Sequence, residues 1–148
     1  MTQTEIIQII TGFIGSLGFA ILFNVRGRKM LFAALGGLFS WTMFILLGFI
    51  IESEPIRYFI VAASVSIYAE VMARVLRTPT TTFIMTALIP LIPGGSLYYT
   101  MAYAFESDLN RFLDKGIYTL ELALALALGV IIAAAATKTL FRLLPQKK

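Results

Sequence analysis

Apolar residues run along this chain in five long blocks, which short polar stretches separate. A helix needs about 20 mostly apolar residues to cross the hydrocarbon core of a bilayer, and each block is about that long. The pattern predicts an all-α fold, a polytopic membrane helix bundle with five transmembrane segments, in a single transmembrane domain over residues 1–148. The spans are expected at about residues 6–23, 30–51, 56–76, 80–105 and 116–141.

The fourth block interrupts its own helical pattern, because its centre reads PLIPGG. Pro90 and Pro93 have no backbone N–H to donate to a helix, and Gly94 and Gly95 permit left-handed or extended conformations. We expect the fourth span to be broken at Pro90–Ser96, near the middle of the membrane. Unpaired backbone groups in hydrocarbon cost several kcal/mol each, so the break must be covered by protein or face a water-filled cavity.

A broken helix of this kind is where many secondary transporters bind their substrate. The second half-helix would offer unpaired N–H groups and a partial positive charge to an anion. Ser96 could cap that end or touch a ligand, and Tyr98 and Tyr99 follow one turn later. A proline kink without any ligand is the alternative. The candidate substrate-binding residues are Pro90, Pro93, Gly94, Gly95, Ser96 and Tyr99.

Two acidic residues lie inside predicted spans, where charges are costly and usually functional. Glu70 has Arg74 at i+4, so a structural ion pair is the alternative to a role in proton coupling. Glu121 has no basic residue at i±3 or i±4, which makes it the better proton-coupling candidate, although a polar contact between helices is also open. Both acids lie on rows of small residues, which are typical of close helix packing in membranes, so we expect both to face protein or a cavity. The rows are Ala62, Ser66 and Glu70, and Glu121, Ala125, Gly129, Ala133 and Thr137.

The composition agrees with a membrane protein and argues against an enzyme. Of the 148 residues 59% are hydrophobic and 14% are charged, whereas a soluble domain carries about 25% charged residues. The chain has no cysteine and no histidine, and it has no P-loop, dinucleotide fingerprint, nucleophile elbow or acidic cluster with metal spacing. We therefore expect no enzymatic activity, no cofactor, no metal site and no nucleic-acid partner.

The charges orient the predicted helices in the cell membrane. Nine basic residues fall on one side of the five crossings, and the other side has only Arg57, Arg111 and Lys115 with most of the acids. The positive-inside rule places the nine in the cytoplasm, so the N-terminus lies outside and the C-terminus inside. The first residues do not resemble a cleavable signal peptide, so we expect the first helix to be retained. The nine are Arg26, Arg28, Lys29, Arg74, Arg77, Lys138, Arg142, Lys147 and Lys148.

Two segments resemble a known transporter family. LGFAILFNV at Leu17–Val25, with the basic loop after it, resembles the start of the small membrane subunit of the threonine/serine exporter family. IPLIPGGSLYYTM at Ile89–Met101 resembles the P-x-x-P-G segment of that family, and the similarity extends over nearly the whole chain. The resemblance implies export of small hydroxy amino acids, or of small dicarboxylates in related members, driven by the proton gradient.

The same resemblance implies a partner. In that family a larger component carries a soluble N-terminal region and further membrane helices, either fused or as a separate chain. The preferred interpretation is one half of a two-component secondary exporter in a homo- or hetero-oligomer within the lipid bilayer. Two alternatives remain, a structural subunit that only stabilises a partner, and a self-associating channel, for which pore-lining polar residues are scarce.

Overall fold

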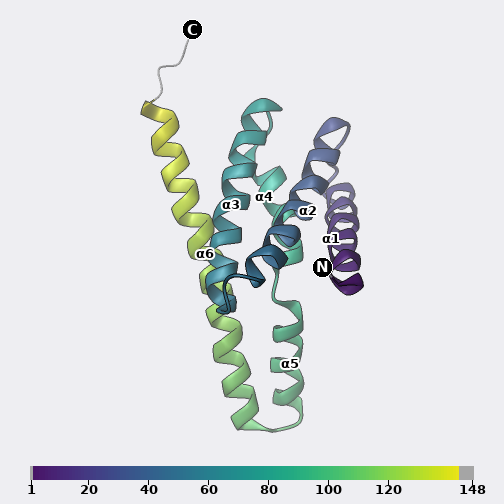
Figure 1. The fold of residues 1–148 in the computed structure, drawn as a ribbon, viewed down its shortest axis with the longest axis vertical. Helices are drawn as coiled ribbons and strands as arrows, with labels where there is room; N and C mark the ends of the chain where they lie inside the picture. The colour runs from purple at the N-terminus through teal and green to yellow at the C-terminus, as the bar shows by residue number, and fades with distance from the viewer. Residues whose placement is uncertain (1, 144–148) are drawn as a thin grey trace.

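The computed structural model describes residues 2–143, and within them every regular element is a helix (Figure 1). Four helices are long and apolar enough to cross a membrane, and a bent pair makes a fifth if it counts as one span. The prediction of an all-α polytopic bundle is confirmed. The elements are α1 (Gln3–Leu22), α2 (Arg28–Gly48), α3 (Glu54–Val75), α4 (Thr80–Leu88), the short 3₁₀ turn η1 (Ile89–Leu91), α5 (Gly94–Phe105) and α6 (Leu109–Leu143).

Local sequence signals explain where the first and third helices begin. Thr2 caps α1 through a reciprocal pair of hydrogen bonds, because its hydroxyl accepts from the Glu5 N–H and the Glu5 carboxylate accepts from the Thr2 N–H at 2.7 Å. Ser53 precedes α3, and Pro55 lies in its first turn, where the missing N–H costs no helical hydrogen bond. These signals place both helix starts within three residues of the expected boundaries.

Helices α1 to α4 alternate in direction, and α6 runs alongside α3 (Figure 1). The bundle therefore has two ends. We call one the basic end, where the α1–α2 and α3–α4 connections carry Arg26 and Arg77. We call the other the acidic end, where α1 begins near Glu5 and the α2–α3 connection carries Glu52. Lys147 and Lys148 lie outside the described residues, and the side chain of Arg142 is not among those described.

The core consists of two clusters of buried side chains, one toward each end. Between the two clusters, small residues let neighbouring helices approach each other closely. A Cβ added to Gly129 of α6 would collide with the backbone carbonyl oxygen of Phe59 and lie 3.0 Å from the Cβ of Ala62 on α3. The Ser66 hydroxyl donates to the Val130 carbonyl across the same contact. The clusters are Ala20, Val25, Ala33, Ala69, Ala73 and Phe83 near the basic end, and Phe44, Tyr58, Val61, Val65, Ala87, Leu91 and Leu122 near the acidic end.

The break in the fourth segment is present and lies inside the bundle. Helix α4 ends at Leu88, η1 follows, and α5 leaves at an angle of 58°. Leu91 is fully buried, and Pro90 borders a cavity with Gly12 and Gly15 at the middle of α1. The first part of the turn is thus sheltered by protein, whereas Ile92, Gly94 and Gly95 are exposed and need cover from outside the described chain.

The second half-helix was expected to complete the crossing beside the other helices. Its observed position is different. The Tyr118 hydroxyl donates to the Glu54 carboxylate, and the Ser96 and Thr119 hydroxyls are 2.8 Å apart. These bonds put the start of α5 level with the start of α3. The rest of α5 and the first part of α6 extend beyond the acidic end as a helical hairpin (Figure 1).

The length of α6 explains this protrusion. The polar stretch before it was expected to be a connection, yet the helix begins at Leu109 because the Asp108 carboxylate accepts from the Arg111 N–H at 3.1 Å and caps it. A helix of 35 residues is roughly 52 Å long at 1.5 Å per residue. The hydrocarbon core is only about 30 Å thick, so α6 cannot fit within a single crossing.

The α3–α6 contact gives a test of the fold. We expect Gly129→Ala to lower the melting temperature in detergent, because its Cβ overlaps the α3 backbone, and overpacking of this kind costs roughly 1–3 kcal/mol. Gly18→Ala is the matched control, since no heavy atom lies within 4 Å of its Cβ position. Equal melting temperatures for the two variants would show that α3 and α6 do not pack through Gly129.

Candidate functional site

The turn between α4 and α5 leaves the start of α5 open. Pro93 is the residue before the helix, and no side chain caps it. The Gly94 N–H donates to the Ile92 carbonyl at 2.6 Å and the Leu97 N–H to the Pro93 carbonyl at 3.0 Å. The N–H groups of Gly95 and Ser96 belong to the first turn, where a helix offers no acceptor. These two donors are therefore available to an anion.

The two glycines at this start have unoccupied space around them. No heavy atom lies within 4 Å of a Cβ built on Gly94 or Gly95, and neither has the left-handed φ that favours glycine. The expected conformational reason for glycine is therefore wrong at both positions. Within the described chain, neither crowding nor backbone geometry requires glycine there, so the space beside them is open to a ligand or to another subunit.

Ser96 does not cap α5 but joins it to α6. Its Oγ lies 2.8 Å from the Thr119 Oγ1, which lies 3.1 Å from the Thr100 Oγ1. The Thr100 hydroxyl also donates to the Ser96 carbonyl, and the Thr119 hydroxyl to the Lys115 carbonyl. Sequence analysis did not single out the two threonines. Tyr99 lies apart from this cluster, exposed and packed between Tyr98 and Tyr103 at ring distances of 5.5 and 6.5 Å.

Two adjoining cavities lie toward the acidic end, the first between α1, α2 and η1 and the second between α1, α2 and α3, and together we call them the vestibule. Their volumes are about 270 and 290 Å³. Both are lined by Gln8 and Trp41, and Pro90 brings the break to the edge of the first. The second has a charged lining of opposite signs, with Glu5 on α1 and Arg57 on α3. Of the candidate substrate-binding residues, only Pro90 lines the vestibule.

Unsatisfied polar atoms gather beside the vestibule. Three buried side-chain polar atoms have no hydrogen-bond partner among the described residues: Trp41 Nε1, Thr42 Oγ1 and Arg57 Nε. Two of the three belong to residues that line the vestibule. Buried polar groups in native proteins are nearly always paired, so such a concentration marks a place where a missing partner would bind.

In the sequence, Arg57 is recognisable only as a charge on the outer side. Its guanidinium lies 4.8 Å from the centre of the Phe44 ring. No carboxylate of the described chain forms an ion pair with it. One signal was available in the sequence, since a basic residue in the first turn of a helix opposes the helix dipole and needs another reason to be there.

Glu70 is buried between helices, as expected. Its carboxylate lies 3.7 Å from an Nη of Arg74, and the Arg74 guanidinium stacks 3.7 Å above the centre of the Phe141 ring on α6. The Glu70 side chain is 9% exposed and that of Arg74 46%. The pair therefore joins α3 to α6 near the basic end, with the carboxylate inside and the guanidinium toward the surface.

Glu121 is exposed, so the expectation that it faces protein or a cavity is wrong within this chain. Its row of small residues does not stay on one face, because four residues at 3.6 per turn advance by about 40°. Gly129 is buried against α3, whereas Glu121, two steps earlier, has rotated onto the outer surface. There it lies among exposed apolar side chains of the same helix, Ile117, Leu120 and Leu124.

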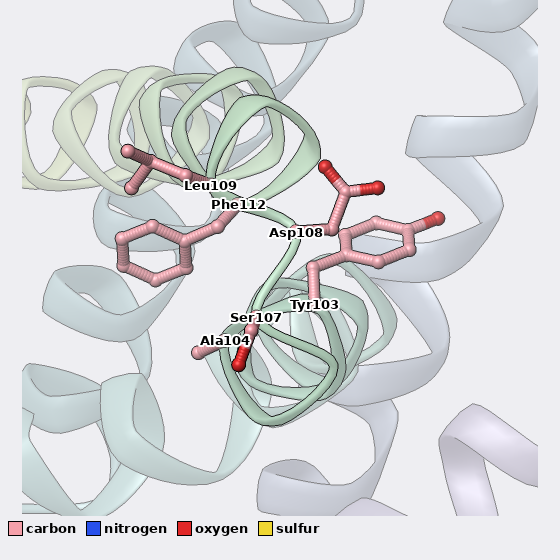
Figure 2. A pocket seen from close by; sticks show the side chains of 6 residues that line it. All are labelled: Tyr103, Ala104, Ser107, Asp108, Leu109 and Phe112. Atoms are coloured by element: carbon pink, nitrogen blue, oxygen red, sulfur yellow. The ribbon is translucent and has the colours of Figure 1, made fainter.

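A further cavity of about 250 Å³ lies at the tip of the α5–α6 hairpin. Figure 2 shows the Asp108 carboxylate beside the Tyr103 ring, with Phe112 and Leu109 on the other side of the chain. Asp108 caps α6 and forms an ion pair with Arg111 at 3.3 Å. Its carboxylate is thus already used by the turn, which makes this cavity part of the hairpin rather than a candidate binding site.

Comparisons with known proteins identify the family. The family model described as Threonine/Serine exporter, ThrE, matches residues 8–136, which include the break and every lining residue of the vestibule except Glu5. No curated protein and no solved structure matches the chain. Since the match covers well over half of a chain whose helices can cross a membrane, the chain belongs to the threonine/serine exporter family of membrane transporters.

Proposed function

We propose that the chain is one membrane subunit of a secondary exporter for small amino acids such as threonine and serine, or alternatively for small dicarboxylates. Its place is the cell membrane, which it crosses several times. Family membership supports the export of a hydroxy amino acid. The observation that carries the proposal is the break between α4 and α5, where Pro90 borders a cavity with polar lining that adjoins the cavity lined by Glu5 and Arg57.

In this proposal the basic end faces the cytoplasm. The described basic side chains there outnumber those at the acidic end and on the hairpin, and cytoplasmic loops carry an excess of lysine and arginine. The N-terminus then lies outside and the vestibule opens outward, on the side to which an exporter releases its substrate. The described basic-end residues are Arg26, Arg28, Lys29, Arg74, Arg77 and Lys138.

The proposed substrate path follows the break. The free N–H groups of Gly95 and Ser96 attract the carboxylate end of the substrate, helped by the partial positive charge of the helix start. Pro90 and Pro93 keep the turn from closing into a continuous helix. The open space beside Gly94 and Gly95 gives a solute access to these donors, and Tyr99 lines the approach one turn later on α5.

A larger partner subunit with a soluble N-terminal region completes the proposed exporter. Among the described residues, α5 packs closely only against α6, and an ionised carboxylate such as Glu121 is costly where it faces lipid. A second surface over this part of α6 would remove that cost. The partner, or a second copy of this chain in a homo-oligomer, would supply that surface.

Proton coupling is assigned to Glu121 and Glu70. Glu121 lies where two subunits would meet, so its protonation could change with the state of the assembly. Glu70 is the second candidate, because its ion pair with Arg74 already gives it a structural role. Protonation of either carboxylate would remove a charge from a low-dielectric environment and so favour a different helix arrangement.

Efflux from cells tests the proposed function. We expect cells loaded with labelled threonine to release it rapidly only when this chain and the partner are both expressed, and to slow when a protonophore collapses the proton gradient. If the efflux rate depends only on how much partner the cells contain, this chain is a structural subunit that stabilises the partner. If the protonophore leaves the release rate unchanged and threonine moves only down its own concentration gradient, the chain forms a channel.

The break gives a second prediction. We expect Gly95→Leu to lower the export rate about tenfold, equivalent to about 1.4 kcal/mol, because the side chain fills the space in front of the free N–H groups. Gly18→Leu is the control, at an exposed glycine of α1 with equally open surroundings. Assembly with the partner should be unchanged in both variants. A Gly95→Leu protein that exports normally would remove the start of α5 from the substrate path.

The coupling residues give a third prediction. In vesicles with an imposed pH gradient, we expect Glu121→Gln to lose the acceleration that the gradient produces while retaining slow exchange, because the amide cannot carry a proton. Asp114→Asn, also on the exposed surface of α6, should respond to the gradient like the unmodified protein. If the pH gradient still accelerates transport by Glu121→Gln, Glu121 does not couple protons. Glu70 is then the remaining candidate, which the Glu70→Gln variant tests in the same vesicles.

A further inference from the structure

We propose that Arg57 binds the carboxylate of a zwitterionic small amino acid in the vestibule. The inference rests on the proposed export function and extends it, because it assigns the carboxylate to a side chain on α3 at the outward-facing end of the path. Pro90 of the break and Arg57 line adjoining cavities, which share Gln8 and Trp41.

The first reason is the unpaired charge of Arg57. Its Nε is enclosed without a hydrogen-bond partner, and no ion pair with a described carboxylate neutralises its guanidinium. A partly buried cation without a counter-ion is costly, and the ring of Phe44 compensates only part of that cost. An anion that enters the vestibule would supply the missing partner.

The second reason is that the guanidinium is held in place before any ligand arrives. It stacks on the Phe44 ring, and a Cβ on Gly48 would lie only 2.9 Å from its Nη1. Glycine at position 48 therefore leaves the room that the guanidinium occupies against the last turn of α2. A guanidinium stacked on a ring by its face still has its N–H groups at its edge, and these match a carboxylate in a two-pronged hydrogen bond.

The third reason is the charge pattern of the cavity. Glu5 lines the same cavity from α1, where its carboxylate also accepts from the Thr2 N–H, and Gln8 lines both cavities of the vestibule. Opposite charges on two walls of one cavity orient a ligand that carries both charges, such as an amino acid, by Coulomb attraction and without a direct bond to Glu5. The volume of about 290 Å³ is at the small end of ligand pockets, about 300 Å³ and upward, which suits a solute with few heavy atoms.

The experiment measures binding in nanodiscs made from the uncharged lipid phosphatidylcholine, with the chain and its partner assembled. The probes are threonine and threoninamide, which differ only in the carboxylate. We expect the unmodified protein to bind threonine at least tenfold more tightly than threoninamide, and Arg57→Gln to lose that preference. Gly48→Ala should weaken threonine binding as well, because it displaces the guanidinium without removing its charge.

The matched control is Arg111→Gln, at an exposed arginine on the hairpin that already pairs with Asp108. It should keep the preference for threonine, and thermal melting checks that each variant is folded. If folded Arg57→Gln still prefers threonine to threoninamide, Arg57 is not the carboxylate site and the proposal is overturned. The same holds if threonine binds the unmodified protein no more tightly than threoninamide.

Two further outcomes distinguish this proposal from lipid binding at Arg57 and from the proposed export function. Anionic phosphatidylglycerol in the nanodisc offers a phosphate to the same guanidinium. If Arg57 affects only the binding of that lipid and not of threonine, the occupant is a headgroup and the proposal is overturned. If threonine binding depends on Arg57 while no export occurs with the partner present, the proposed export function fails and the carboxylate site stands.

Discussion

The structure depends on one constraint, which is that backbone polar groups inside a bilayer must find partners within the protein. The segment around Pro90 and Pro93 cannot meet this requirement as a helix, because proline has no N–H to donate. The chain meets it in part by turning where Leu91 is fully buried and Pro90 lies against the small residues of α1, and it leaves the N–H groups of Gly95 and Ser96 without a partner in the described chain. The neighbouring cavities exist because a turn and glycines pack less completely than a continuous helix with larger side chains.

The turn also decides where the rest of the chain goes. Because α5 leaves at 58° and starts level with the start of α3, it finds its main packing surface on α6 rather than on the bundle. The Ser96, Thr119 and Thr100 hydroxyls hold the two helices together at that level. The result is a four-helix bundle continued by a long helix and a hairpin, a shape that leaves much of α5 and α6 for contact with other membrane components.

Charges inside this apolar chain are handled in three different ways. Glu70 is buried and paired with Arg74, which makes it part of the α3–α6 contact. Arg57 is held by Phe44 and by the space at Gly48 but has no ion-pair partner in the described chain. Glu121 is on the outer surface of α6. Glu70 has its counter-charge within the chain, and in the proposed exporter a solute pairs with Arg57 and a second subunit covers Glu121.

Much of the fold could be read from the sequence because the signals are local. Five apolar blocks determine the helices, two prolines with missing N–H groups determine the break, and the P-x-x-P-G segment indicates the family. The early start of α6 was missed, although Asp108 is a local cap, because the polar composition around it resembles a connection. Only the tertiary structure brought Glu5 and Arg57 into one cavity, turned Glu121 outward and joined Ser96 to Thr119. The physical reason is that helix caps, prolines and runs of apolar residues influence only the backbone within a few positions of themselves. Which side chains meet depends on the rotation of each helix about its axis, and that rotation is set by the close contacts between helices.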